Sequence, residues 1–340
     1  MKKSITPFIL QLPKAELHVH LAGTLTPEQT MTFAQRNHLP IPFQSLEGIK
    51  KAYHSFDDLE SFIELYNTVN KVLQTEEDFY DLTYAYLKNA ATEHVLHAEI
   101  FFEVQTHLPR GIQFATVING LHRASIQAEQ DIGITSNFIL CFLRNLSQEE
   151  AFAILDMSLA YKDYIVGIGL AGQEKGYPPS AFADVFKKAK EAGYKLCAHA
   201  GEDVGPDYIW QAIRLLNVDR IDHGVQCVKD PTLVAYLRET ELPITVCPLS
   251  NKALGIVANL ADHPLKKMCA ASLNVSINSD DPPFFGGMIN ANYQAAYDFI
   301  GLSKEQLIAC ARNSIRASFV SETKKNRMLK RLEHAINTNY

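Results

Sequence analysis

The sequence predicts an α/β fold, a (β/α)8 TIM-type barrel with a helical insertion after strand 1 and extra C-terminal helices. Eight short apolar runs have the length and composition of buried strands. Amphipathic segments with helix signals separate these runs, and such alternation indicates a parallel sheet. Eight repeats in 340 residues indicate that the sheet closes into a barrel. The expected strands are residues 16–21, 95–104, 134–144, 165–171, 195–200, 220–223, 243–248 and 274–278.

The segments between these strands contain sequence signals for the starts and ends of helices. A capping box places Ser or Thr before the first turn and Glu or Gln three residues later. Three such boxes pair Thr26 with Gln29, Ser147 with Glu150, and Ser303 with Gln306. Gly193 follows an amphipathic run and predicts a helix end.

Residues 37–91 form an insertion that is too long for one crossover and is rich in aromatic side chains. Its pattern is mostly helical, and it either covers the mouth of the barrel as a lid or packs against its side. No linker, low-complexity segment or internal repeat interrupts the chain. We therefore expect one domain over residues 1–340.

The composition argues against several classes of protein. The net charge is −6 and no dense run of Lys or Arg occurs, so a nucleic-acid partner is not expected. No apolar stretch is long enough to span a bilayer, and the short apolar run near the N-terminus is broken by Pro7. The six cysteines show no close pairing, which is typical of reduced thiols in a cytoplasmic protein. Oligomeric state is left open.

A metal site is predicted where the strands end. His18 and His20 alternate on the first strand, so both side chains project from the same face. His199 and Asp280 end the fifth and eighth strands, and catalytic groups of such barrels gather at these ends. Three imidazoles and one carboxylate suit a divalent ion, zinc first, with an open position for water. A single histidine is more often a hydrogen-bonded core residue, and only the combination predicts one zinc per chain.

Four further residues are candidates for chemistry beside the metal. Glu202, three residues after His199, suits a general acid. His223 suits a partner for the attacking water, or is simply a histidine at a helix start. Asp281 points to the substrate, or caps the turn before a proline. Gly172 allows a close backbone approach to a flat ring, or serves an ordinary turn.

Six motifs together resemble the adenosine/adenine deaminase family of zinc aminohydrolases over nearly the whole chain. They are Pro13-Lys-Ala-Glu-Leu-His-Val-His20, Gly169-Leu-Ala-Gly172, His199-Ala-Gly-Glu202, Arg220-Ile-Asp-His-Gly224, Cys247-Pro-Leu-Ser-Asn251 and Asn278-Ser-Asp-Asp-Pro282. The resemblance implies a (β/α)8 barrel with one zinc on His18, His20, His199 and Asp280. It implies that Glu202 donates a proton to purine N1, that His223 assists the attacking water, and that Asp281 hydrogen-bonds N7. The expected reaction is hydrolysis at C6 of a 6-aminopurine with release of ammonia, a step of purine salvage.

The substrate is expected to be adenine, because the segments around Cys247 and Asp280 are similar to the branch of the family that deaminates the free base. Ala22 stands where adenosine deaminases carry an acidic residue that bonds the ribose, and also departs from the adenine branch. Leu170–Glu174 is more similar to the adenosine branch. Adenosine, or a modified adenine or adenosine, therefore remains an alternative substrate.

Two other classes compete with this interpretation. A binuclear hydrolase of esters or lactams would need a bridging lysine at the end of the fourth strand, but no lysine precedes Lys175 there. A catalytically silent metal-binding relative would be indicated by loss of Glu202 or His223, and both are present. Fold alone cannot separate these classes, because barrels host many chemistries.

Overall fold

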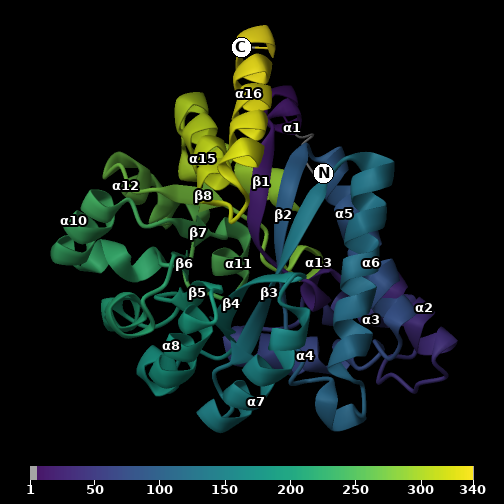
Figure 1. Cartoon of the computed structure of the whole chain (residues 1–340). Coiled ribbons are helices and arrows are strands. Elements are labelled where there is room, and N and C mark those ends of the chain that lie inside the picture. The colour runs from purple at the N-terminus through teal and green to yellow at the C-terminus, as the bar shows by residue number, and fades with distance from the viewer. Residues whose placement is uncertain (1–5, 340) are drawn as a thin grey trace.

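The computed structural model describes residues 6–339 and contains the predicted barrel. Eight strands form one parallel sheet in the order of the sequence, and helices surround it (Figure 1). The strands are β1 (Lys14–His20), β2 (Val95–Phe102), β3 (Thr135–Leu143), β4 (Ile165–Ala171), β5 (Lys195–Ala200), β6 (Arg220–His223), β7 (Ile244–Val246) and β8 (Val275–Ile277). Every predicted strand is confirmed, and β4, β5 and β6 have the expected bounds.

The barrel closes between β8 and β1 with little regular pairing. A single bridge joins Val19 to Asp280, with the Asp280 N–H bonded to the His18 carbonyl at 3.0 Å. Side chains replace the missing ladder. Asn278 Oδ1 accepts from the Leu17 N–H at 2.8 Å, and Glu16 Oε1 accepts from the Ser279 N–H at 2.8 Å. The closure therefore lies at the chain segments that carry His18 and Asp280.

Helices cover the outside of the barrel. α1 (Pro7–Gln11) precedes β1, and the later crossovers contain α6 (Phe114–Ile132), α7 (Gln148–Ser158), α8 (Ala183–Glu191), α9 (Pro206–Gln211), α10 (Pro231–Thr240), α11 (Pro248–Ala253) and α12 (Leu265–Ala270). The capping boxes at Thr26, Ser147 and Ser303 are all present. Gly193 has a φ of 84° just after α8, which confirms the predicted helix end.

The insertion after β1 is helical, as predicted. It follows α2 (Pro27–Arg36) and contains α3 (Leu46–Ala52), α4 (Leu59–Asn70) and α5 (Glu76–Thr92). Both predicted roles occur, because α4 lines the cavity at the mouth whereas α5 packs along α6. Phe62 of α4 packs on Phe285, with ring centroids 4.8 Å apart, so this helix is held over the mouth by aromatic contacts.

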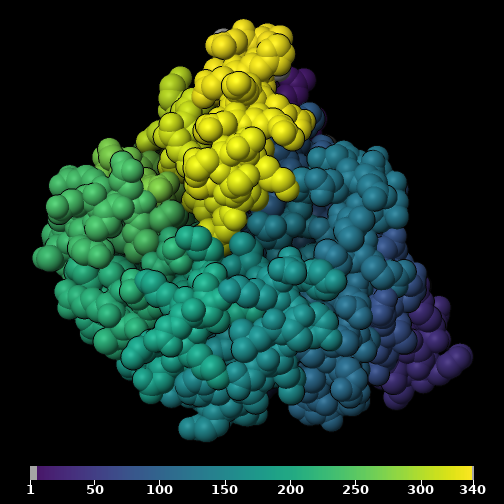
Figure 2. All heavy atoms as spheres, viewed as in Figure 1, coloured from purple at the N-terminus to yellow at the C-terminus, as the bar shows by residue number. Residues whose placement is uncertain are grey.

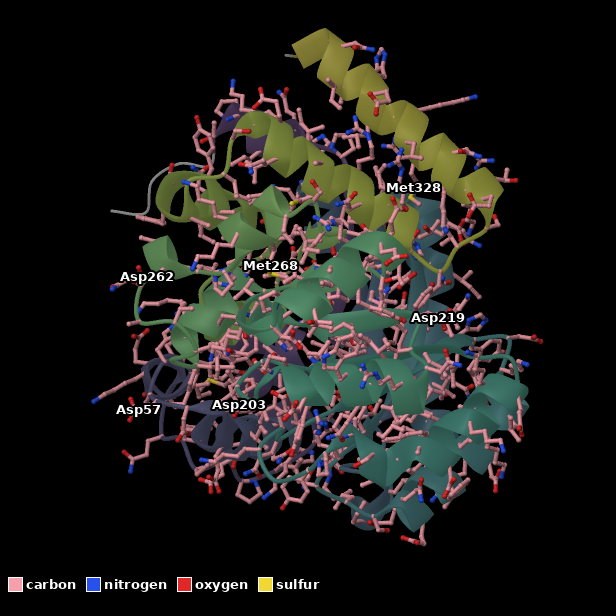
Figure 3. The ribbon with its side chains drawn as sticks, turned by 90° about the vertical axis from the view of Figure 1, so that its left-hand side faces the viewer. Asp57, Asp203, Asp219, Asp262, Met268 and Met328 are labelled. Carbon is pink, nitrogen blue, oxygen red and sulfur yellow. The ribbon has the colours of Figure 1, made fainter. Side chains whose placement is uncertain are left out.

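The chain ends in further helices, namely α13 (Pro282–Phe285), α14 (Ile289–Ala295), α15 (Lys304–Ala317) and α16 (Glu322–Asn339). α16 stands out from the body of the molecule in the space-filling view (Figure 2). A second view shows it from the side, with Met328 near its barrel-facing end (Figure 3). Met328 and Leu332 are buried and anchor the helix.

No helix within residues 6–339 is long and apolar enough to cross a membrane. The cysteines are all free. That residues 1–340 make up a single domain stays a prediction.

Candidate active site

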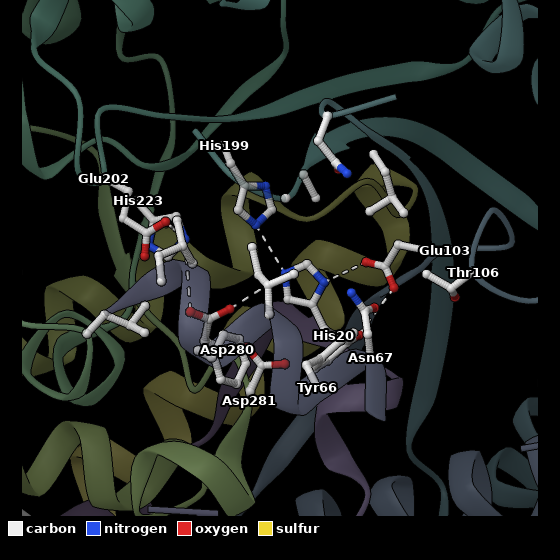
Figure 4. Close-up of a pocket in the computed structure, with 18 of the residues that line it drawn as sticks. His20, Tyr66, Asn67, Glu103, Thr106, His199, Glu202, His223, Asp280 and Asp281 are labelled. Carbon is white, nitrogen blue, oxygen red and sulfur yellow. Dashed lines mark hydrogen bonds and ion pairs between the residues drawn. The ribbon is translucent and has the colours of Figure 1, made fainter. Parts of the chain in front are cut away.

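One cavity at the carboxyl ends of the strands gathers most of the predicted site residues (Figure 4). Among the predicted residues its walls include His20, Gly172, His199, Glu202, His223, Asp280 and Asp281. His18 lies behind this surface and is completely buried. The barrel therefore brings together residues at the ends of five of its strands. The segments that meet there are far apart in the sequence, since Glu16 and Ser279, which are bonded at the barrel closure, are 263 positions apart.

The imidazole nitrogens and the Asp280 carboxylate converge closely. His18 Nε2 lies 3.2 Å from Asp280 Oδ1, and His20 Nε2 lies 3.1 Å from His199 Nε2 and 3.6 Å from Asp280 Oδ1. The buried His18 Nε2 has no hydrogen-bond partner among the described residues. His18 thus presents a buried, unpaired nitrogen to a carboxylate and two other imidazoles. Together these four groups form a ligand set of the kind that binds a divalent ion. The residues present therefore fit a metal.

His223 is as close to this centre as the predicted ligands. The ligand-type atoms of His18, His199, His223 and Asp280 all lie within 4.8 Å of one another. This group includes His223 and leaves out His20, so proximity alone does not select the predicted set.

Outer contacts distinguish the histidines. A metal-binding imidazole normally directs its other nitrogen to a carboxylate, hydroxyl or carbonyl. His20 Nδ1 donates to Glu103 Oε1 at 2.8 Å, and His18 Nδ1 lies 2.9 Å from Thr245 Oγ1. His199 Nδ1 lies 3.7 Å from Asp222 Oδ2.

His199 Nδ1 has no hydrogen-bond partner among the described residues, and the same holds for the buried Nδ1 of His223. His223 Nε2 lies 3.6 Å from Glu202 Oε2 and 3.9 Å from Asp280 Oδ2. The outer hydrogen bonds therefore favour His18 and His20 as ligands. His199 and His223 differ instead in what their Nε2 atoms face, which is His20 Nε2 at 3.1 Å for His199 and Glu202 for His223.

A buried ionic network holds these outer contacts in place. Thr245 Oγ1 donates to Asp222 Oδ1 at 2.9 Å, so its oxygen is left to accept from His18 Nδ1. Arg220 Nε lies 3.4 Å from Asp222 Oδ1, and Arg220 Nη1 lies 2.6 Å from Glu99 Oε2. All three side chains are completely buried. The network fixes which nitrogen of His18 faces the metal centre.

Sequence reasoning missed Glu103, Thr245 and the role of Asp222. A signal existed for Glu103, because it is a carboxylate inside the apolar run 95–104. A charged residue at such a position needs a partner. Which partner it finds depends on the barrel, since His20 is 83 residues away.

Burial sets the charge of the two free carboxyl groups. The pKa of Glu202 is raised well above its usual value by burial and by the negative charge of Asp280. The pKa of Asp281 is raised well above its usual value by the same two causes. Both shifts favour the protonated form, in which a carboxyl group can donate a hydrogen bond.

The pKa values of His223 and His20 are shifted in opposite directions. Burial and the neighbouring His18 lower the pKa of His223 to about 3, so its ring is neutral. Burial disfavours charge on His20 as well, but Glu103 outweighs it and raises the pKa to about 10. The site thus stabilises positive charge beside His20, which a bound cation would also satisfy.

Backbone geometry at the site is unusual. His223 and Asp280 have φ values of 66° and 65°, in the left-handed region that residues with a Cβ rarely adopt. Such strain concentrates at functional sites. Gly172, with φ 95°, lines the cavity as predicted.

Gly23 is a second glycine that the site requires. A Cβ at Gly23 would lie 1.7 Å from Asp281 Oδ1, so only glycine leaves room for this carboxyl group. Asp281 Oδ1 is buried and has no hydrogen-bond partner among the described residues. Its carboxyl group is thus available to a ligand in the cavity.

Ala22 offers no polar group to a nucleoside. It is buried, and the described residues that line the cavity do not include it. It lies in the short 3-10 turn Ala22–Thr24 after β1. Substrate choice must therefore be argued from other walls of the cavity.

Comparison with known proteins agrees with the motifs. The family model described as adenosine deaminase matches residues 13–335. The adenine deaminase of Wolinella succinogenes is 46% identical over 329 residues, covering 97% of this chain and 99% of the relative. The crystal structure of an adenine deaminase from Arthrobacter aurescens superposes with a TM-score of 0.94 at 42% identity, covering 96% of this chain and all of that one.

A more distant neighbour contains a metal. The crystal structure of an amidohydrolase from Burkholderia ambifaria, with bound zinc, has a TM-score of 0.90 at 26% identity and covers 99% of this chain and 96% of its own. The matched motifs, the full-length coverage and the shared barrel lead to one conclusion. This chain belongs to the adenosine deaminase family.

Proposed function

We propose that this chain hydrolyses adenine to hypoxanthine and ammonia, with one zinc held by His18, His20, His199 and Asp280. The observation that carries the proposal is the placement of two buried carboxyl groups, Glu202 and Asp281, beside the four proposed ligands in one cavity, where burial raises the pKa of both. A flat purine offers ring nitrogens that accept hydrogen bonds, and these carboxyl groups can donate them. The relatives named adenine deaminase, at 46% identity and near-complete coverage, support this substrate.

Each residue has a role that its charge permits. Zinc held by these four residues would supply the nucleophile, because a bound ion of this kind lowers the pKa of water. Glu202, whose protonated form is favoured by burial, donates its proton to N1 and makes C6 more electrophilic. The neutral ring of His223 accepts a hydrogen bond from the attacking water and lies 3.6 Å from Glu202. Asp281 donates to N7, and the backbone of Gly172 lies against the ring.

Apolar side chains over the mouth favour a free base. Leu59, Phe62 and Ile63 of α4 line the cavity together with Leu254 and Phe285. Ribose hydroxyls packed against these side chains would lose their hydrogen bonds to water without replacement. We therefore expect kcat/KM for adenine to exceed that for adenosine by about 100-fold.

A substrate panel tests the function. Adenine, N6-methyladenine, adenosine and guanine are each incubated with the zinc-loaded protein, and the released amine is measured, which is methylamine for N6-methyladenine and ammonia for the others. Glu202→Gln protein purified in parallel controls for contaminating deaminases. A preference for adenosine or for N6-methyladenine would refute the adenine assignment and keep the reaction. Absence of ammonia from every 6-aminopurine would instead indicate a catalytically silent relative.

A further inference from the structure

Glu174 makes an unusual set of contacts beside the site. It lies two residues after Gly172, is 1% exposed, and is bound to the loop that follows β5. Its Oε1 accepts from the Gly201 N–H at 2.5 Å. Its Oε2 accepts from the N–H groups of Glu202, Asp203 and Val204 at 3.0, 2.9 and 3.0 Å. One carboxylate thus binds four consecutive backbone donors.

These donors have no acceptor of their own in a regular element. Gly201 has a φ of 72°, so the chain turns sharply after β5 and directs successive N–H groups to one side. Such a concave run of N–H groups binds an anion. The carbonyl of Glu202 is bound as well, by Gln226 Nε2 at 2.9 Å. Both polar groups of the Glu202 backbone are therefore held.

A second contact ties the same two loops together. Arg144 donates to the His199 carbonyl at 2.7 Å and to the Tyr177 carbonyl at 2.8 Å. The loop after β4, which carries Gly172, is thereby joined to the segment that carries His199 and Glu202. The backbone expected to lie against the purine and the acid expected to protonate it share one support.

We propose that Glu174 is a positioning residue for the reaction, because its carboxylate fixes the loop that aims Glu202 into the cavity. This inference rests on the proposed function. Glu174 contacts neither metal nor substrate and acts only through the placement of Glu202. It follows that loss of Glu174 slows proton transfer more than it weakens binding.

Glu174→Gln tests this role with little change in size. A glutamine can accept hydrogen bonds at only one of its two terminal atoms, and its amino group would face a backbone N–H. We expect kcat on adenine to fall by about 10- to 100-fold, since small misplacements of a catalytic group have effects of this order. KM should stay within about threefold and zinc content should be unchanged. Glu174→Asp, which keeps the charge, should recover part of kcat and replaces the Gln variant if that one fails to fold.

A double-mutant cycle separates positioning from a structural role. If Glu174 acts through Glu202, adding Glu174→Gln to Glu202→Gln should change kcat by less than about threefold, because coupled residues are not additive. An equal loss of kcat in both backgrounds would overturn the proposal.

Asp78→Asn is the matched control. Asp78 is also a buried carboxylate that accepts from backbone N–H groups, those of Gln74 and Thr75 at 3.0 and 2.9 Å, but it lies at the start of α5, away from the cavity. The Asp78→Asn variant should unfold at a lower urea concentration than the native protein and should have an unchanged kcat. A Glu174→Gln protein with normal kcat refutes the positioning role alone, whereas an inactive native protein refutes the proposed function.

Discussion

Charge at the residue scale is what makes this cavity a candidate for deamination. Glu202 and Asp280 are both acidic and both lie in the cavity, yet their environments separate them. Burial and neighbouring carboxylates raise the pKa of Glu202, whereas burial of Asp280 is outweighed by His18 and leaves its pKa well below the usual value. One group therefore keeps a proton to donate, and the other stays ionised to hold a cation.

Glu202→Gln tests the proton donor. The amide keeps the size of the side chain but has no acidic proton, so kcat on adenine should fall by about 10²–10⁴-fold. Zinc content and the urea midpoint should remain close to the native values. A variant with nearly native kcat would assign the proton to another group.

The pH profile follows from the direction of the Glu202 shift. In the proposed mechanism the protonated form is the active one, and burial raises its pKa above the usual value. Stopped assays from pH 5 to 10 should show kcat falling as the pH rises through this raised pKa. The residual rate of Glu202→Gln should lack that alkaline decline. A native rate that instead climbs at alkaline pH contradicts the acid role.

At the scale of elements, the important feature is the closure between β8 and β1. The bridge at Val19 and Asp280 is accompanied by side-chain bonds, so register there depends on particular residues more than on a ladder. His18 and Asp280 lie on the two sides of this closure. Their 3.2 Å approach therefore depends on it.

Asn278→Ala should weaken both the fold and the metal site. The buried Leu17 N–H would lose its acceptor at 2.8 Å, which costs about 1–3 kcal/mol in free energy of unfolding. Urea denaturation and zinc affinity by competition with a chelating dye measure the two effects. Asn274→Ala removes an exposed amide-to-carbonyl bond before β8 and should change stability by less than about 0.5 kcal/mol. Equal effects of both variants would argue against a special role for the closure.

For the whole molecule, the proposed metal centre would join distant parts of one barrel. Its proposed ligands come from β1, β5 and the segment after β8, so a bound ion links the first strand to the last. An ion that binds only the folded state stabilises it in proportion to the logarithm of its concentration. Metal content and global stability should therefore change together.

Removing the metal with dipicolinate should abolish activity and lower Tm. At free zinc of 100 times Kd, the ion adds about 2.7 kcal/mol, and adding one equivalent of zinc should restore both properties. The Tm of Asp280→Asn should respond much less to the chelator. Elemental analysis should find one zinc per chain. Two tightly bound ions per active chain, or activity that survives chelation, would contradict the proposed centre.

Much of this architecture follows from local signals in the chain. Alternating apolar strands and capped helices predict the order of the barrel, and the three capping boxes form where Thr26, Ser147 and Ser303 stand. The strand-end positions of His18 and His199 predict their meeting, because parallel strands in a barrel end on one face. These features depend on residues adjacent in the sequence and on hydrophobic periodicity, so they can be predicted without the structure.

The contacts that complete the site depend on the tertiary structure. Glu103 reaches His20, and Glu174 binds the loop of Glu202, only because the closed barrel brings their strand ends together. Gly23 leaves room for the Asp281 carboxyl group only because the turn after β1 and the segment after β8 meet in the closed barrel. The charges of Glu202 and His223 likewise come from burial and from neighbours distant in the chain. Desolvation and Coulomb interaction depend on distance in space, which separation along the sequence does not specify.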